Sequence, residues 1–238
     1  MEPAFSAWQL GARALPTDAA GQGVVQPTPK ALRVRRFPTT DLLPPPAGGR
    51  FRGTIEPITP AIRARMGDTW LPGCPVPLAD LRYLTVSFRG FDGRPHTGEI
   101  VVAARVARDV VSVFRALYAA DYPIEEMRLP TTADLEAPPT GDGNNTAGMV
   151  CRTARGSTTL SAHAYGLAVD VNPFLNPYRK GDRVLPELAS AYLDRSRTQP
   201  GIIHAGDVVV RAFERIGWTW GGSWNSLKDY QHFSATGR

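Results

Sequence analysis

Residues 161–173 constrain the fold most, because they join a buried-strand pattern to two side chains that can bind metal. From residue 166 to residue 172, apolar residues alternate with small or polar ones, as in a strand with one buried face. We expect the other face, which carries Asp170 among small residues, to form the floor of a site. His163 lies seven residues before Asp170, an odd separation that puts the two on opposite faces of a continuous strand. Gly166 is therefore predicted to bend the chain between them.

The end of the chain carries a second carboxylate and imidazole, Asp229 and His232, three residues apart. A strand would separate these side chains, so we predict a turn or bulge between them. His163, Asp170 and His232 together supply two imidazoles and one carboxylate. This set leaves a fourth tetrahedral position open for water, as in catalytic zinc sites. These residues predict a zinc hydrolase.

The same two blocks of sequence resemble a known family. Ser-x-His-x-x-Gly-x-Ala-x-Asp, followed near the end of the chain by Asp-x-x-His, is similar to the M15 zinc peptidases. This group contains the D-alanyl-D-alanine carboxypeptidases and L-alanyl-D-glutamate endopeptidases that cut peptidoglycan peptides. The likeness runs from about Leu78 to Phe233 and includes Phe91-Asp92-Gly93, His96, Gly98, Tyr122-Pro123-Ile124, Asn144-Asn145-Thr146, Cys151-Arg152, Asn172-Pro173, Asn176-Pro177-Tyr178 and Gly217-Trp218.

The resemblance implies zinc as the cofactor, with His163, Asp170 and His232 as its ligands. It also implies the fold of that family, which is shared with hedgehog signalling domains. Asp229 stands where the family has its catalytic acid, so it would take a proton from the metal-activated water and pass it to the leaving amine. The alternative role for Asp229 is to orient a ligand histidine by accepting its spare N–H.

Further candidates for the site are weaker. Arg152 is the second catalytic candidate, because a guanidinium can bind a substrate carboxylate or stabilise an oxyanion, and Arg128 is held in reserve. A solvated surface position is the alternative for either arginine. The predicted substrate-binding residues are Ser161, Asn145, Trp220 and Trp224. A loop-capping role for the serine and core packing for the tryptophans stay open.

The chain of 238 residues, 42% of them hydrophobic, is long enough to bury one good core. Three consecutive prolines at 44–46, followed by Gly48 and Gly49, are typical of a linker. We therefore expect residues 1–50 to be a Pro/Gly-rich N-terminal extension or linker. Residues 51–238 are expected to form the zinc peptidase catalytic domain.

Local patterns predict strands at 81–88 and 124–129, and a long helix at about 103–120. Shorter helices are predicted at 61–67, 187–194 and 205–216, with a long loop at about 130–147. The order strand, helix, strand, then loops and further strands favours an α+β class, with a mainly antiparallel sheet and flanking helices.

The net charge of +5 favours polyanionic surroundings, although a solvated basic surface is the simpler interpretation. Basic residues cluster tightly only at 33–36, so we expect no nucleic-acid partner. No run of eighteen apolar residues and no signal peptide are visible. We expect a monomer that is secreted or lies in the cell envelope. Cys74 and Cys151 could form one disulfide there, or remain two buried thiols.

Two functions from different classes follow. The first is a zinc-dependent peptidase that hydrolyses peptidoglycan stem-peptide bonds involving D-amino acids, as a D,D-carboxypeptidase or an L,D-endopeptidase. The second is a non-catalytic zinc-containing cell-wall binding module of the same fold. Asp229 favours the enzyme, because a binding module has no need for a carboxylate in the position of the base. The chain contains no Gly-x-Ser-x-Gly or His-Glu-x-x-His motif, so the patterns of serine hydrolases and zincins are absent.

Overall fold

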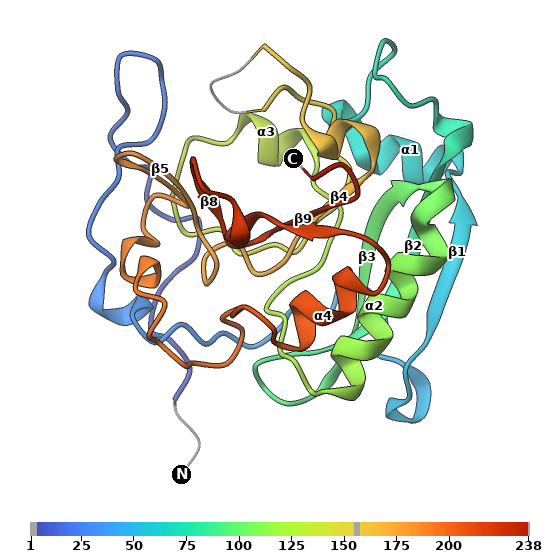
Figure 1. Cartoon of the computed structure of the whole chain (residues 1–238), viewed down its shortest axis with the longest axis horizontal. Coiled ribbons are helices and arrows are strands. Elements are labelled where there is room, and N and C mark those ends of the chain that lie inside the picture. The colour runs from blue at the N-terminus through green and yellow to red at the C-terminus, as the bar shows by residue number, and fades with distance from the viewer. Residues whose placement is uncertain (1–3, 155–157, 238) are drawn as a thin grey trace.

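The computed structural model describes residues 4–154 and 158–237. Within these ranges, helices combine with three small antiparallel sheets of three strands each (Figure 1). The predicted α+β class is therefore confirmed in outline, although the strands form three separate sheets. No helix in the described part of the chain is long and apolar enough to cross a membrane.

The largest sheet has the order β1-β2-β3, with β1 at Gly53–Pro57, β2 at Leu81–Arg89 and β3 at Pro95–Ala103. The long helix α2, Ala107–Ala119, packs against this sheet (Figure 1). Its buried side includes Val110, Val113 and Leu117, each at most 1% exposed. The predicted strand at 81–88 and helix at 103–120 are both confirmed. The helix is preceded by a 3₁₀ turn at Ala104–Val106.

Two smaller sheets carry the end of the chain. One has the order β4-β9-β7, from Ala168–Asp170, His232–Ser234 and Thr219–Trp220. The other has the order β6-β5-β8, from Arg183–Leu185, Tyr178–Lys180 and Lys228–Asp229. A two-residue turn at 230–231 separates Asp229 in β8 from His232 in β9, which confirms the turn predicted there.

The other helices are short. α1 covers Pro60–Met66, as predicted, and is capped by Thr59. α3, Thr132–Glu136, lies in the segment predicted as a loop, where Thr131 and Asp134 form a reciprocal capping box. α4 covers only Val208–Glu214, because the Asp207 side chain caps its first amides. It is accordingly shorter than the helix predicted at 205–216.

Two predicted elements are wrong. The helix expected at 187–194 is only a 3₁₀ turn at Ser190–Leu193. The strand expected at 124–129 is an irregular segment that makes single bridges, such as the one between Glu126 and Asn145. Its apolar residues are buried, but in the described parts of the chain its bridges to other segments are isolated single pairs, so it belongs to no ladder.

The main core joins the large sheet to the β4-β9-β7 sheet. Leu167, Val169 and Val171 are at most 5% exposed within it, so the predicted apolar face of residues 166–172 is confirmed. Phe213 of α4 stacks on Phe233 of β9, with ring centroids 4.1 Å apart. This packing fixes β9, and with it His232, against the rest of the protein.

Residues 4–50 contain two 3₁₀ turns, at Lys30–Leu32 and Ala47–Gly49, and an isolated β-bridge between Thr17 and Gly23, yet they make long-range contacts. Leu32 is fully buried. The buried guanidinium of Arg35 donates two hydrogen bonds to Glu125, at 2.6 and 2.8 Å. Asn144 donates a further bond to the same carboxylate at 3.0 Å. This part of the N-terminal segment is thus held by a buried ion pair.

Glu125→Ala is expected to destabilise the protein by about 3–5 kcal/mol, because the buried guanidinium of Arg35 loses its counter-charge. Urea unfolding at equilibrium measures the change. The double variant Arg35→Met/Glu125→Leu removes both charges and should recover most of the loss. If Glu125→Ala costs under about 1 kcal/mol, the range of an exposed pair, the ion pair is not buried in solution.

The two cysteines form a disulfide, Cys74–Cys151, which joins positions 77 residues apart. Closing a loop of this length restricts the unfolded chain, so reduction should lower the free energy of unfolding by about 2–4 kcal/mol. Urea unfolding with and without dithiothreitol measures this. The Cys74→Ala/Cys151→Ala variant should be insensitive to the reductant. Equal stability of the oxidised and reduced wild type would show that the bond does not restrict the unfolded state.

Candidate metal centre

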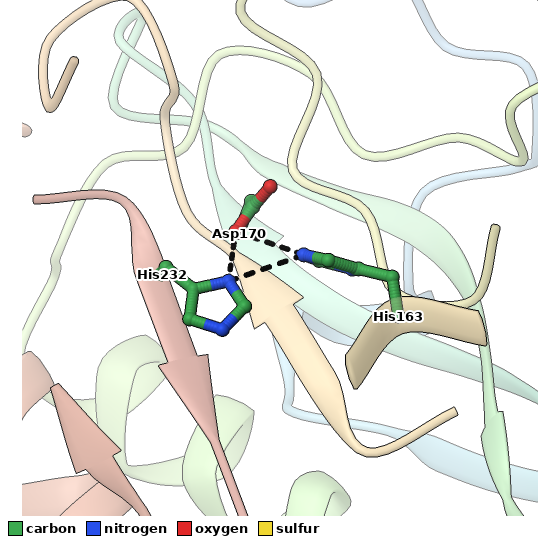
Figure 2. A group of neighbouring side chains, drawn as sticks. All are labelled: His163, Asp170 and His232. Carbon is green, nitrogen blue, oxygen red and sulfur yellow. Dashed lines mark hydrogen bonds and ion pairs between the residues drawn. The ribbon is translucent and has the colours of Figure 1, made fainter. Parts of the chain in front are cut away.

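Three side chains from three elements converge on one point (Figure 2). His163 comes from the 3₁₀ turn Ala162–Tyr165, Asp170 from the end of β4 and His232 from the start of β9. His163 Nε2 lies 3.2 Å from both Asp170 Oδ1 and His232 Nδ1. His232 Nδ1 lies 3.0 Å from the same carboxylate oxygen. Both histidines are only 5% exposed.

The local sequence explains how His163 and Asp170 come to the same side. Ser161 Oγ accepts a hydrogen bond from the His163 amide and caps the 3₁₀ turn. Gly166 ends the turn with φ of 63°, in the left-handed region, which confirms the predicted bend. A Cβ at Gly166 would also lie 2.6 Å from the Ala103 amide nitrogen. The pairing of β4 with β9 then sets Asp170 opposite His232.

The backbone of residues 147–148, at the end of the predicted loop, contacts two residues of the cluster. The Gly148 carbonyl accepts a hydrogen bond from His163 Nδ1 at 2.7 Å, which leaves the lone pair of a neutral ring on Nε2, toward the cluster. Ala147 exchanges both backbone hydrogen bonds with Asp170. The only sequence signal for this segment is its place in the resemblance, at 144–146.

The spacing of the three ligand atoms fits a metal ion. Bonds of about 2.0–2.1 Å in tetrahedral geometry separate neighbouring ligand atoms by about 3.3 Å. The distances here are 3.0 to 3.2 Å. Burial raises the pKa of Asp170, but His163 and His232 outweigh it and hold that pKa well below its ordinary value. The cluster can therefore offer an ionised carboxylate and two imidazole nitrogens to a divalent cation.

Asp229 lies close to this cluster, and its pKa is raised whereas that of Asp170 is lowered. Burial raises its pKa to about 7, and the negative charge of Asp170 adds to the shift, against the opposing effects of His232, a hydrogen bond with Gln231 and the charge of Arg152. Its Oδ1 is buried and has no hydrogen-bond partner among the described residues. Buried oxygens are normally hydrogen-bonded, so this unpaired oxygen beside the His163–Asp170–His232 cluster is available to a ligand. A carboxyl with this pKa can gain or lose a proton at neutral pH.

The two arginine candidates are in different situations. Arg152 is exposed, and its positive charge lowers the pKa of Asp229, so it lies within electrostatic range of the cluster. Arg128 donates two hydrogen bonds to Asp134, at 2.6 and 2.7 Å, and another to Glu126. The charge of Arg128 is thus already neutralised, whereas no ion pair of Arg152 is found among the described residues.

The four predicted substrate-binding residues also differ in what they contact. Trp224 is half-buried, with its ring centroid 5.4 Å from that of His232. Trp220 donates its indole N–H to the Tyr230 carbonyl and lies in the packing around β9. Asn145 uses both ends of its amide to bond the backbone of Arg128, at 2.9 and 3.0 Å. Ser161 caps the turn of His163, and only Trp224 contacts a residue of the cluster through its ring.

Comparison with protein families adds an independent result. Residues 155–235 match the model of an M15 peptidase family, described as D-alanyl-D-alanine carboxypeptidase. This match supports an M15 family peptidase. The cluster and Asp229 lie inside the matched range, whereas Arg152 and Asn145 lie before it. Comparisons with curated proteins and with solved structures gave no match. For an M15 peptidase the substrate is a peptide.

Proposed function

We propose that this protein is a zinc-dependent peptidase that hydrolyses peptidoglycan stem-peptide bonds involving D-amino acids, as a D,D-carboxypeptidase or an L,D-endopeptidase. The observation that carries the proposal is the unpaired, buried carboxyl oxygen of Asp229 beside the His163–Asp170–His232 cluster. The proposed fold is that of the hedgehog and D-Ala-D-Ala peptidase group. Residues 51–238 would be the catalytic domain, with residues 1–50 as an extension bound to it.

His163, Asp170 and His232 would hold the zinc ion. When bound, zinc polarises a peptide carbonyl and lowers the pKa of water, so that an amide can be attacked at neutral pH. Gly148 keeps His163 in the tautomer whose Nε2 carries the lone pair. Asp170 would supply one negative charge, which offsets half of the charge of the divalent cation.

Asp229 would move the proton. Its carboxylate would take a proton from the attacking water and give it to the leaving amine. Burial raises the pKa of Asp229 and a bound cation would lower it, and a working base needs the two effects to balance. Arg152 would bind a substrate carboxylate or stabilise the oxyanion, because its charge is near Asp229. Trp224 would form a wall against which the substrate lies.

The alternative is a non-catalytic zinc-containing binding module. Asp229 again favours the enzyme, because leaving one oxygen of a buried carboxyl group without a hydrogen bond destabilises a fold and is retained where it has a function. The disulfide supports the proposed location, secreted or in the cell envelope, since such bonds persist in oxidising compartments.

Mass spectrometry of purified muropeptides tests the proposed reaction. After incubation with the zinc-loaded protein, we expect either loss of the terminal D-alanine or separation of L-alanine from D-glutamate. A chelator should stop the reaction and added zinc should restore it. Unchanged muropeptides in the presence of zinc would favour the binding module.

A further inference from the structure

The β6-β5-β8 sheet has positively charged side chains on the same face as Asp229. Tyr178 of β5 is paired with Asp229 of β8, and Lys180 of β5 with Arg183 of β6. Residues directly opposite in antiparallel strands share a face, as do residues two apart in one strand. Tyr178, Lys180 and Arg183 therefore share the face of Asp229. Arg179, between the first two, projects from the opposite face.

The electrostatics of Tyr178 agree with this register. Burial raises the pKa of its hydroxyl, the negative charge of Asp229 raises it further, and the positive charge of Arg183 lowers it. The Tyr178 hydroxyl is therefore within electrostatic range of both Asp229 and Arg183. β5 and β8, which are about fifty residues apart in sequence, lie side by side (Figure 1).

The two cations on this face are not neutralised by the protein. In the described part of the chain, neither Lys180 nor Arg183 forms an ion pair. Lys180 is exposed and Arg183 is half-buried. The acidic residue of this hairpin, Asp182, lies exposed in the turn between them. Arg128, by contrast, is paired with two carboxylates.

We propose that Lys180 and Arg183, with Tyr178 between them and Asp229, form a subsite for a carboxylate of the substrate peptide. This inference rests on the proposed function and adds a determinant of substrate choice. Lys180 is two residues along β5 from Tyr178, which is paired with Asp229, so the cations lie about 6.7 Å along the strand from Asp229. One residue of an extended substrate peptide spans about 3.3–3.6 Å. The bound carboxylate therefore lies one or two residues from the cleaved bond. In a stem peptide it is the α-carboxylate of D-glutamate or the C-terminal carboxylate.

Binding of three peptides tests the subsite without catalysis. The probes are L-Ala-γ-D-Glu-L-Lys-D-Ala-D-Ala, its D-isoglutamine form and its C-terminal amide. Isothermal titration uses zinc-loaded Asp229→Asn protein, which is expected not to cleave them. Neutralising the recognised carboxylate should weaken binding by about tenfold, the value of one charge-assisted hydrogen bond. The amide form that binds more weakly than the acid form identifies the carboxylate that the subsite recognises.

Variants then assign the effect to one face of the hairpin. In the same Asp229→Asn background, Lys180→Gln/Arg183→Gln should bind the acid and amide forms equally. Arg179→Gln removes one positive charge from the opposite face of the same hairpin and should keep the difference. All these side chains are at least partly exposed, so thermal unfolding should change little and serves as the control for folding.

Equal binding of all three peptides before mutation, or no binding of any, would overturn the subsite. Loss of the difference in affinity between acid and amide forms in Arg179→Gln would also overturn it, because the effect would then reflect net charge alone. If the preference depends on Lys180 and Arg183 while the wild type cuts none of the peptides, the subsite stands and the proposed hydrolysis fails.

Discussion

Replacing Asp229 with asparagine should abolish most peptide hydrolysis and leave bound zinc in place. Asparagine keeps the shape of the side chain but cannot take up a proton, and general acid–base catalysis contributes about 10²–10⁴-fold to a rate. The fall should appear in kcat for a stem peptide. Zinc content, measured by plasma mass spectrometry, should stay at one ion per chain. Folding should be preserved, since burial already disfavours the charged form of Asp229.

A matched carboxylate change separates this effect from a general loss of charge. Glu214→Gln alters an exposed residue of α4 and should leave kcat unchanged. If Asp229→Asn keeps more than a tenth of the wild-type kcat, Asp229 is not the base. If it instead loses zinc, Asp229 supports the ligands and does not move the proton.

Replacing His163 with alanine should remove zinc and activity together. The change takes away one of three protein ligands, and loss of even an outer-shell partner weakens metal binding by about 10–100-fold. We therefore expect a loss of at least about 100-fold, which competition with a chromophoric chelator measures. Activity should return only partly at high zinc concentration.

His204 provides the matched histidine for this experiment. It lies before α4 and outside the cluster, where its backbone amide donates to the Asp207 carboxylate. His204→Ala should bind zinc like the wild type. Stoichiometric zinc retained by His163→Ala under the same competition would remove His163 from the ligand set.

The local half of the candidate site could be predicted from the sequence. Alternation at 166–172 and the odd spacing of His163 and Asp170 require a bend, and Gly166 supplies it with a positive φ. These are short-range steric arguments, so they do not depend on the rest of the fold. The turn between Asp229 and His232 follows in the same way.

The long-range half could not be predicted from local pattern. β4 has only three residues, and its pairing with β9 joins positions 62 apart in sequence. The ligand count of a catalytic zinc site and the family resemblance connect these two parts, but neither predicts which strands pair. The support from Gly148, the ion pair of Arg35 and the placement of Tyr178 opposite Asp229 are all tertiary contacts. Irregular segments such as 144–149 have no periodicity that would reveal such contacts.

Anomalous diffraction at the zinc edge, from crystals of the zinc-loaded protein, locates the bound metal. We expect one strong peak within bonding distance of His163 Nε2, Asp170 Oδ1 and His232 Nδ1. A non-protein oxygen should fill the fourth position, within hydrogen-bonding reach of Asp229. A peak elsewhere, or a fourth ligand supplied by the protein, would contradict the proposed zinc site.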